Sequence, residues 1–398
     1  MTLRSVVTSV LVLAVLVPAG AARAQSVDDL FDPTTLQDIQ LFMAVRDLQT
    51  LRAHVHEDTY YTAELQYRGL RVRNIGIRSR GNTTRNPAKP SLRLDFNRYT
   101  TKGTFLGLSA LVLDNSVQDP SLIRERIAMS FFSRMGVPAP RESYARLFIN
   151  GTYQGVYTIV EALDAKLMTR LGDSAGYLFQ FRLSDTKYLG EDLGNDFEPY
   201  TVKFERQNHD KDADTLVYTP IREMLRQLNG PNDAVYRQMV EKYFDLSQFV
   251  THVAIETFLS QEDGVLGIYG MNNFFLYRQG SSNQHRIGPW DQDKVFASIE
   301  SGIFERADEN IWFRRAIAIP ELRRQYLAVL EQCARSAVED DWLMQEVVNS
   351  AALVDGAVRA DRNKPSSNDE FDDAVEFFKE FARRRSAFVL AQLARERR

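Results

Sequence analysis

The chain is organised around the stretch Ile287-Gly288-Pro289-Trp290-Asp291-Gln292-Asp293-Lys294-Val295-Phe296. Two carboxylates, Asp291 and Asp293, stand here between apolar flanks that would bury them. Charged groups are rarely removed from water unless an opposite charge compensates them. In an extended segment, residues i and i+2 point to the same side, so both carboxylates could meet one cation. A solvated turn after Gly288-Pro289 is the alternative interpretation.

Length and composition describe a globular protein with a sizeable core, because the 398 residues are 44% hydrophobic and 26% charged. The N-terminus differs from the rest. Arg4 precedes an apolar run over residues 6–17, and Ala22-Arg23-Ala24 offers a small-x-small cleavage site before Gln25. We therefore expect residues 1–24 to be a secretory signal peptide. A transmembrane anchor is the competing interpretation, but the run is short and a proline and a glycine follow it.

No later stretch has the length and apolarity of a membrane span, so no stable membrane insertion is expected after cleavage. The mature protein is expected in the periplasm, outside the cell or at the cell surface. Removing Arg4 and Arg23 leaves 47 cationic residues against 53 acidic ones, a formal charge of −6. This balance predicts no nucleic acid partner. The single cysteine, Cys333, excludes a disulfide framework and is expected to be a small buried residue rather than a nucleophile.

The first half of the chain is rich in predicted strands. Residues 38–51 have roughly helical spacing, but from Tyr60 the apolar pattern repeats every two residues. Hairpin turns are predicted at Arg68-Gly69 and Asn150-Gly151. Asp119-Pro120 is predicted to open a helix, with the aspartate as N-cap and the proline at the first helical position.

The second half is mainly helical, and Asp245 is predicted to cap a helix that ends near Glu262-Asp263. Acidic residues at the C-terminus of a helix are unfavourable for its dipole, which favours a functional role for at least one of them. Further helices are predicted over 311–319, 320–338, 342–362 and 374–395. Strands first and helices second predict an α+β fold.

Five ordered segments resemble the signatures of a known family. They are Arg80-Gly81-Asn82-Thr83-Thr84 with Lys89-Pro90-Ser91, Asp119-Pro120-Ser121-Leu122-Ile123-Arg124, Asn150-Gly151-x-Tyr153-x-Gly155-x-Tyr157-x-x-x-Glu161, Asn273-Phe274-Phe275-Leu276-Tyr277, and Pro289-Trp290-Asp291-Gln292-Asp293. Together they resemble the CotH kinase-like family, atypical secreted protein kinases named for a spore coat protein. The resemblance runs from about residue 60 to the C-terminal helices.

The resemblance implies one kinase-like domain over residues 25–398 with a bilobal atypical protein-kinase-like fold. An N-terminal antiparallel β-rich lobe would span about 60–205, and a mainly helical lobe over about 215–398 would carry the metal site. The implied activity is transfer of the ATP γ-phosphate to Ser or Thr of a protein substrate, with Mg²⁺ or Mn²⁺. Such a reaction needs cations for the phosphates, carboxylates for the metal, and a carboxylate that orients the attacking hydroxyl.

The same resemblance implies roles for the acidic residues. Asp263 would be the catalytic carboxylate and Asp291 the principal metal ligand. Mg²⁺ takes one or two carboxylates plus phosphate oxygens and water. Asp293 and Asn273 would therefore complete the protein's share of the ligands, with Asn272 as the alternative to Asn273.

Lys89 is the expected phosphate contact, with Glu161 as its ion-pair partner and Arg80 as an alternative phosphate contact. The chain departs from the family pattern at Phe296-Ala297, where an aromatic residue and a glycine are common. No glycine-rich phosphate loop of the ordinary kinase kind is present.

Two other functions fit the same residues. One is a catalytically silent surface or matrix binding module that keeps the scaffold. The other is a metal-dependent glycosyltransferase, because an Asp-x-Asp pair also suits nucleotide-sugar chemistry. A hydrolase is disfavoured because the five histidines stand in no nucleophile or zinc motif.

Overall fold

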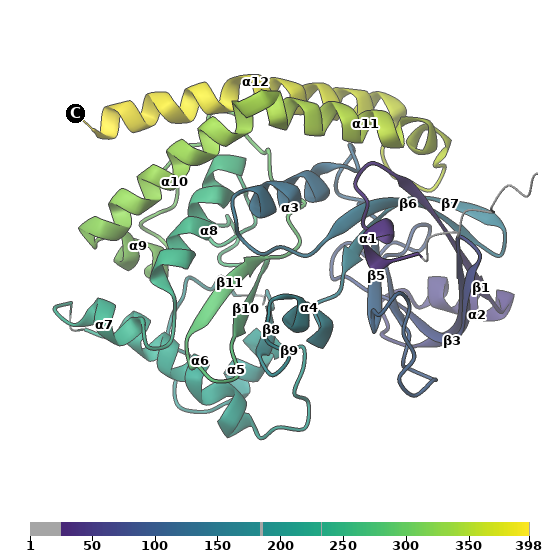
Figure 1. Ribbon diagram of the computed structural model, residues 1–398, viewed down its shortest axis with the longest axis horizontal. Helices are drawn as coiled ribbons and strands as arrows, with labels where there is room; N and C mark the ends of the chain where they lie inside the picture. The colour runs from purple at the N-terminus through teal and green to yellow at the C-terminus, as the bar shows by residue number, and fades with distance from the viewer. Residues whose placement is uncertain (1–24, 184–185, 232, 398) are drawn as a thin grey trace, which may run out of the picture.

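A computed structural model describes residues 25–183, 186–231 and 233–397. The predicted signal peptide, residues 1–24, lies outside them. The fold is mixed α+β, as predicted, with a strand barrel, a smaller second sheet and a helical C-terminal part (Figure 1). Over the described ranges, no helix combines the length and apolarity needed to cross a membrane.

The barrel takes up most of the first 161 residues. Its strands are β1 Leu36–Met43, β2 Tyr61–Tyr67, β3 Leu70–Ser79, β4 Leu92–Asp95, β5 Ala110–Asp114, β6 Glu142–Ile149 and β7 Thr152–Glu161. They close in the order β1-β2-β3-β4-β5-β7-β6. Neighbouring strands are antiparallel except β1 and β6, whose parallel pairing closes the barrel. The expected antiparallel β-rich region is therefore present, but as a closed barrel.

Side chains along the barrel strands point alternately inward and outward, and the inward apolar ones fill the barrel. On β4, Leu92 and Leu94 are buried in the interior while Arg93 between them is only partly buried on the outside. The two predicted hairpin turns are confirmed. Both residues of Asn150-Gly151 have positive φ, at 51° and 79°, and Arg68-Gly69 has the same pattern. These conformations match the twist of paired strands.

Two helix predictions need correction. Residues 36–43 form β1 and only Val45–Ala53 form a helix, α2, because pairing with both β2 and β6 outweighs the helical spacing. The helix predicted from Pro120 begins at Arg124 instead. Leu122 has a φ of 55°, which breaks helical continuity, and the Asp119 carboxylate accepts from the backbone N–H of Arg124.

The second sheet lies in the helical part of the molecule. Its strands are β8 Tyr177–Phe181, β9 Phe204–Arg206, β10 Phe274–Arg278 and β11 His285–Pro289, in the order β11-β10-β8-β9. Strand β8 and the start of β9 lie within residues 60–205, where we expected the β-rich lobe. Strand β8 pairs with β10 on one side and with β9 on the other, not with the barrel, and its antiparallel pairing with β10 brings Leu276 opposite Phe179 in the apolar core.

Helix α1, Val27–Leu30, packs against the barrel. The remaining helices are α3 Arg124–Arg134, α4 Ala165–Arg170, α5 Glu198–Lys203, α6 Asp214–Asn229, α7 Tyr236–Val240, α8 Leu246–Leu259, α9 Ile311–Ile317, α10 Pro320–Val338, α11 Trp342–Ala360 and α12 Asn368–Glu396, with a 3₁₀ turn, η1, at Glu339–Asp341. Cys333 on α10 is wholly buried, as expected. The Asp245 cap is confirmed, because its side chain accepts from the backbone N–H of Gln248.

The connection between α11 and α12 is anchored to the barrel (Figure 1). Asp361 in this connection pairs with Lys89 at 2.8 Å, and both side chains are fully buried. Asp361 also accepts from the backbone N–H of Val156 on β7, at 3.1 Å. Gly155 allows this approach, since a Cβ there would lie 2.2 Å from an Asp361 oxygen. A buried ion pair thus joins the last two helices to the barrel.

Removing the cation of this pair tests its structural weight. Lys89→Met leaves the Asp361 charge buried without its partner, so we expect the free energy of unfolding to fall by about 3–5 kcal/mol. Urea denaturation measures the loss. Lys187→Met is the matched control, because Lys187 pairs with Glu309 at the surface and should cost about 0–1 kcal/mol. Equal, small losses in the two variants would contradict the anchoring role.

Candidate functional site

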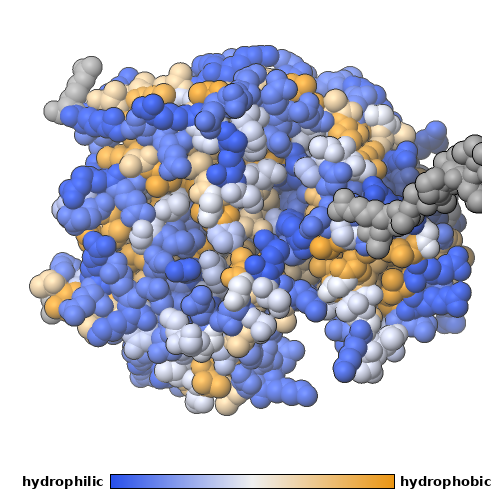
Figure 2. Space-filling model, viewed as in Figure 1, coloured by the Kyte–Doolittle hydropathy of each residue, from blue (hydrophilic) through white to orange (hydrophobic). Residues whose placement is uncertain are grey.

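A cavity of about 650 Å³ lies between the barrel and the second sheet. On the barrel side it is lined by residues of β3, β4 and β5 and by the loop 80–85. Opposite them lie residues of β8 and β9, Asp263, residues 272–273 and the segment around Trp290. The face in Figure 2 is indented between the barrel and the helical part, and hydrophilic residues gather along this junction.

Asp291 and Asp293 both line this cavity, directly after the end of β11 at Pro289. The extended geometry assumed from the sequence is wrong at this point, because Asp291 has a φ of 53°. Between the two aspartates, Gln292 is fully buried and donates to the backbone carbonyls of Asn273 and Trp290 at 3.0 and 3.1 Å. The turn is therefore fixed from behind by Gln292 while both carboxylates stay in the cavity wall.

Asp263 lies in the same wall. One of its oxygens, Oδ2, accepts from the side-chain amides of Asn272 and Asn273, each at 3.1 Å. The other oxygen, Oδ1, has no hydrogen-bond partner in the described part of the chain. The following loop is held by Glu256 of α8, which accepts from the backbone N–H of Val265 at 2.8 Å. Of the acidic pair at the helix end, Asp263 thus faces the cavity, whereas Glu262 is exposed.

The three aspartates of the cavity wall have raised pKa values, because their charged forms are unfavourable there. Burial, followed by the negative charge of Asp114, raises the pKa of Asp291 to about 6. Burial likewise raises the pKa of Asp293 well above its usual range, with Asp291 adding to the effect. It raises the pKa of Asp263 as well. Lys294 opposes all three shifts, and Arg80 also opposes that of Asp291, but neither cancels them, so the wall favours a further cation.

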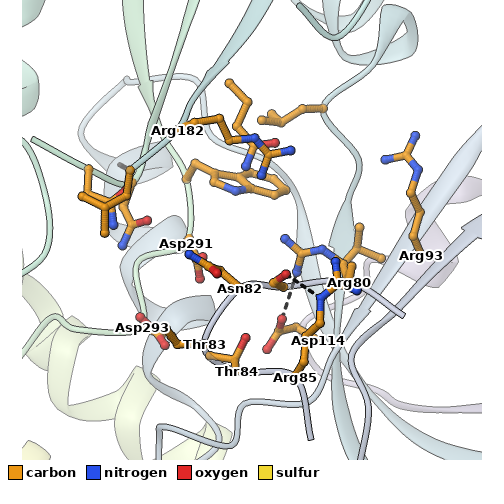
Figure 3. Close-up of a pocket in the computed structure, with 18 of the residues that line it drawn as sticks. Arg80, Asn82, Thr83, Thr84, Arg85, Arg93, Asp114, Arg182, Asp291 and Asp293 are labelled. Carbon is orange, nitrogen blue, oxygen red and sulfur yellow. Dashed lines mark hydrogen bonds and ion pairs between the residues drawn. The ribbon is translucent and has the colours of Figure 1, made fainter. Parts of the chain in front are cut away.

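Sequence reasoning missed Asp114, which lines the cavity from the barrel side. Its carboxylate pairs with Arg80 at 3.0 Å (Figure 3). It also accepts from the Ser91 hydroxyl at 3.1 Å. The available signal was its place at the end of the apolar run Leu111-Val112-Leu113. Arg80 lines the cavity, and Asp114 fixes its position.

Lys89 and Glu161 are not brought together, so the predicted ion pair is wrong. Lys89 pairs with Asp361 and does not line the cavity. Glu161 pairs with Arg141 at 2.9 Å and Arg170 at 2.8 Å. The registers explain this separation. Glu161 lies opposite Leu111 at one end of β5, whereas the backbone carbonyl of Lys89 accepts from Asn115, beyond the other end.

A second acidic pair, also missed, supports the cavity wall. Glu125 on α3 and Glu142 on β6 are 8% and 7% exposed. Burial raises the pKa of each well above its usual range, and the negative charge of Glu142 acts next on Glu125. The charge of Asp291 adds to both shifts. Both carboxyl oxygens of Glu142 are buried without a hydrogen-bond partner among the described residues.

The buried pair predicts a pH-dependent stability. Folded Glu142 keeps a proton that the unfolded chain releases above about pH 4.5, so the free energy of unfolding falls as pH rises from there to the folded pKa. Glu142→Gln removes this loss. We expect the variant to gain stability over wild type at pH 8 by about 1.4 kcal/mol for each tenfold difference in proton affinity removed, and much less at pH 5.

Urea denaturation at the two pH values measures this gain. Glu300→Gln is the control, because the Glu300 side chain is 69% exposed and its substitution should change stability little at either pH. A Glu142→Gln variant that is less stable than wild type at pH 8 would show that the ionised carboxylate is stabilising.

The oxygen-bearing side chains of the cavity wall fit a magnesium ion that takes its other ligands from the phosphates of a bound molecule and from water. Nowhere in the described ranges do three or more His, Cys, Asp or Glu side chains form a group that could hold a metal ion. Asp291, Asp293 and the Asn273 amide oxygen would leave positions for phosphate oxygens and water. Mg²⁺ is usually bound in this way, with few protein ligands. Asn272 lies equally close to Asp263, so either asparagine can supply the amide oxygen.

Comparison with known proteins places the chain in a kinase-like family. The chain belongs to the CotH kinase protein family, whose sequence profile matches residues 77–389, and the predicted family is thereby confirmed. The inner spore coat protein H of Bacillus subtilis (strain 168) is 25% identical over 366 residues, covering 89% of this chain and 97% of that protein.

Two further comparisons are more limited. The inner spore coat protein H-like protein of the same strain is 48% identical over 54 residues, 14% of this chain and 18% of that protein. The crystal structure of the Helicobacter pylori proinflammatory kinase CtkA overlaps 80% of this chain and 98% of its own, with a TM-score of 0.31 and 9% identity.

Proposed function

We propose that the protein is an exported atypical protein kinase that transfers the ATP γ-phosphate to Ser or Thr of a protein substrate with Mg²⁺ or Mn²⁺. The proposal extends the kinase-like family of the chain to a specific reaction. In it, the barrel acts as the N-terminal lobe and the helical part as the C-terminal lobe of a bilobal kinase-like fold.

The observation that carries this proposal is the environment of Asp263. Two asparagine amides hold Oδ2 and leave Oδ1 without a partner in the described residues, in the same cavity wall as Asp291 and Asp293. Oδ1 is itself buried and lacks a donor, so a substrate hydroxyl that reaches it from the cavity would supply the missing hydrogen bond. Phosphoryl transfer needs such an orienting carboxylate beside the groups that neutralise the phosphates.

The reaction balances on these residues. The substrate hydroxyl oxygen forms a bond to the γ-phosphorus, and the bond from that phosphorus to the β,γ-bridging oxygen breaks. ADP leaves with the electron pair of the broken bond. The hydroxyl proton passes to Oδ1 of Asp263, whose raised pKa makes it a better acceptor than an ordinary aspartate.

The remaining roles follow from charge. When bound, the metal ion would neutralise the phosphate oxygens, with Asp291 as principal ligand and Asp293 and Asn273 as additional ones. Arg80 would contact a phosphate, because it lines the cavity and Asp114 holds its guanidinium in place. Lys89 and Glu161 have no part in this scheme, since both are engaged in ion pairs elsewhere.

Substitutions in the acidic wall test the proposal. Asp263→Asn should keep ATP binding but lower transfer of labelled phosphate to an acceptor protein by about 10²-fold or more, because the proton acceptor is lost. Asp291→Asn should weaken Mg²⁺-dependent ATP binding. Calorimetry and a filter-binding transfer assay measure the two effects. Asp340→Asn, at an exposed position on η1, is the control and should change neither.

Three outcomes separate the candidate functions. A wild-type protein that binds no nucleotide with Mg²⁺ or Mn²⁺ would contradict the proposal. Nucleotide binding without phosphate transfer would instead favour the catalytically silent binding module. A preference for nucleotide sugars over ATP would identify a glycosyltransferase.

Export rests on the sequence of residues 1–24 and has its own test. We expect the mature protein, produced with a secretion system, to begin at Gln25 and to be recovered in the periplasm, at the cell surface or in the medium. N-terminal sequencing and fractionation measure both points. An uncleaved protein retained in the membrane fraction would instead indicate a transmembrane anchor.

A further inference from the structure

Among the described residues, five arginines line the cavity, and four of them have a carboxylate partner. Arg78 and Arg85 share Asp58, at 2.9 and 2.5 Å. Arg80 pairs with Asp114 and Arg182 with Glu205. The fifth, Arg93, has no ion pair and no side-chain hydrogen bond to any described residue, although it is partly buried in the wall. It is thus a cation in a cavity without a countercharge of its own.

The sheet register makes this lack of a partner unfavourable. Arg93 on β4 lies directly opposite Arg78 on β3. Like charges that face each other across a strand pair are destabilising. Asp58 serves Arg78 and Arg85, and leaves Arg93 unneutralised. Fold stability alone does not explain an arginine here, whereas an anionic ligand would compensate it.

The other neighbour of Arg93 indicates what kind of anion the cavity would take. On β5, Val112 lies opposite Arg93 and also lines the cavity. It belongs to an apolar cluster that contains Leu163 and Trp290, which line the cavity as well. A ligand here would therefore meet apolar side chains and a free guanidinium together. A nucleotide has this combination, an apolar flat base joined to phosphates.

The order of the charged side chains along the cavity indicates which phosphate of the nucleotide Arg93 would contact. In Figure 3, Asp291 and Asp293 lie on one side, the Arg80–Asp114 pair lies next to them, and Arg93 lies on the far side of that pair. A transferred γ-phosphate belongs at the acidic end, where the proposed metal ligands and Asp263 are. Arg93 is then placed for the opposite end of the polyphosphate.

We propose that Arg93 binds the α-phosphate of the nucleotide, so that it recognises nucleoside mono- and triphosphates but not the free nucleoside. This inference rests on the proposed function. It gives the phosphate-contacting role, expected for Lys89 from the sequence, to Arg80 and Arg93. A guanidinium suits the task because it can donate two parallel hydrogen bonds to one phosphate group.

Calorimetry with ATP, AMP and adenosine in the presence of Mg²⁺ tests the inference on the purified protein. Arg93→Gln should weaken ATP and AMP binding by about tenfold or more and leave adenosine binding unchanged, because one charged hydrogen-bonded contact is lost. Arg93→Lys keeps the charge but not the paired donors, and should give an intermediate loss. Arg73→Gln is the matched control, since this barrel arginine is 70% exposed and lies outside the cavity wall.

The outcomes distinguish the inference from the function on which it rests. If wild type binds ATP and Arg93→Gln binds ATP and AMP equally well, the role of Arg93 is overturned while the proposed function stands. An equal loss for adenosine would place Arg93 against the base and also overturn the phosphate contact. If wild type binds no nucleotide, both fall. Thermal unfolding checks that each variant is folded, which we expect because Arg93 makes no side-chain hydrogen bond or ion pair with the described residues and is only partly buried.

Discussion

The constraint on which the site depends is negative charge that the protein does not fully compensate. Asp263, Asp291 and Asp293 face one cavity, Glu125 and Glu142 lie behind it, and burial raises the pKa of all five. Carboxylates in such surroundings are either protonated or neutralised by a bound cation. Packing alone gives no reason to keep them, so their cost to stability is best understood as the cost of a binding site.

The two ion pairs have different roles, because one connects parts of the fold and the other lines the candidate site. Lys89 and Asp361 are fully buried and tie the connection between α11 and α12 to the barrel. Arg80 and Asp114 form a partly exposed pair in the cavity wall. Both cations come from the same short stretch of sequence, 80–91, and from sequence they are equally plausible phosphate contacts. Their contacts separate them, because Arg80 lines the cavity whereas Lys89 is buried against Asp361.

Sequence features contained in a few neighbouring residues predicted local structure well, whereas apolar spacing alone did not reliably distinguish a helix from a strand. Asn150-Gly151 and Asp245 are confirmed as a hairpin turn and a helix cap, because the chemistry of each feature is contained in a few residues. Residues 38–43 were predicted as the start of a helix because the apolar residues over 38–51 have roughly helical spacing. Their pairing with β2 and β6, far away in the chain, decided the outcome. Arg93 could not be singled out from sequence, because it stands out only once its neighbours prove to be paired.

The sequence by itself determined the family, the strand-then-helix organisation and the acidic character of the stretch from Trp290 to Asp293. These follow from motifs, periodicity and charge, which are properties of neighbouring residues. Only the tertiary structure decided that the strands close into a barrel, that Asp114, Glu125 and Glu142 join the acidic region, and that Lys89 is structural. These outcomes depend on contacts between residues tens to hundreds of positions apart, and no local pattern specifies which of several equivalent charges will meet.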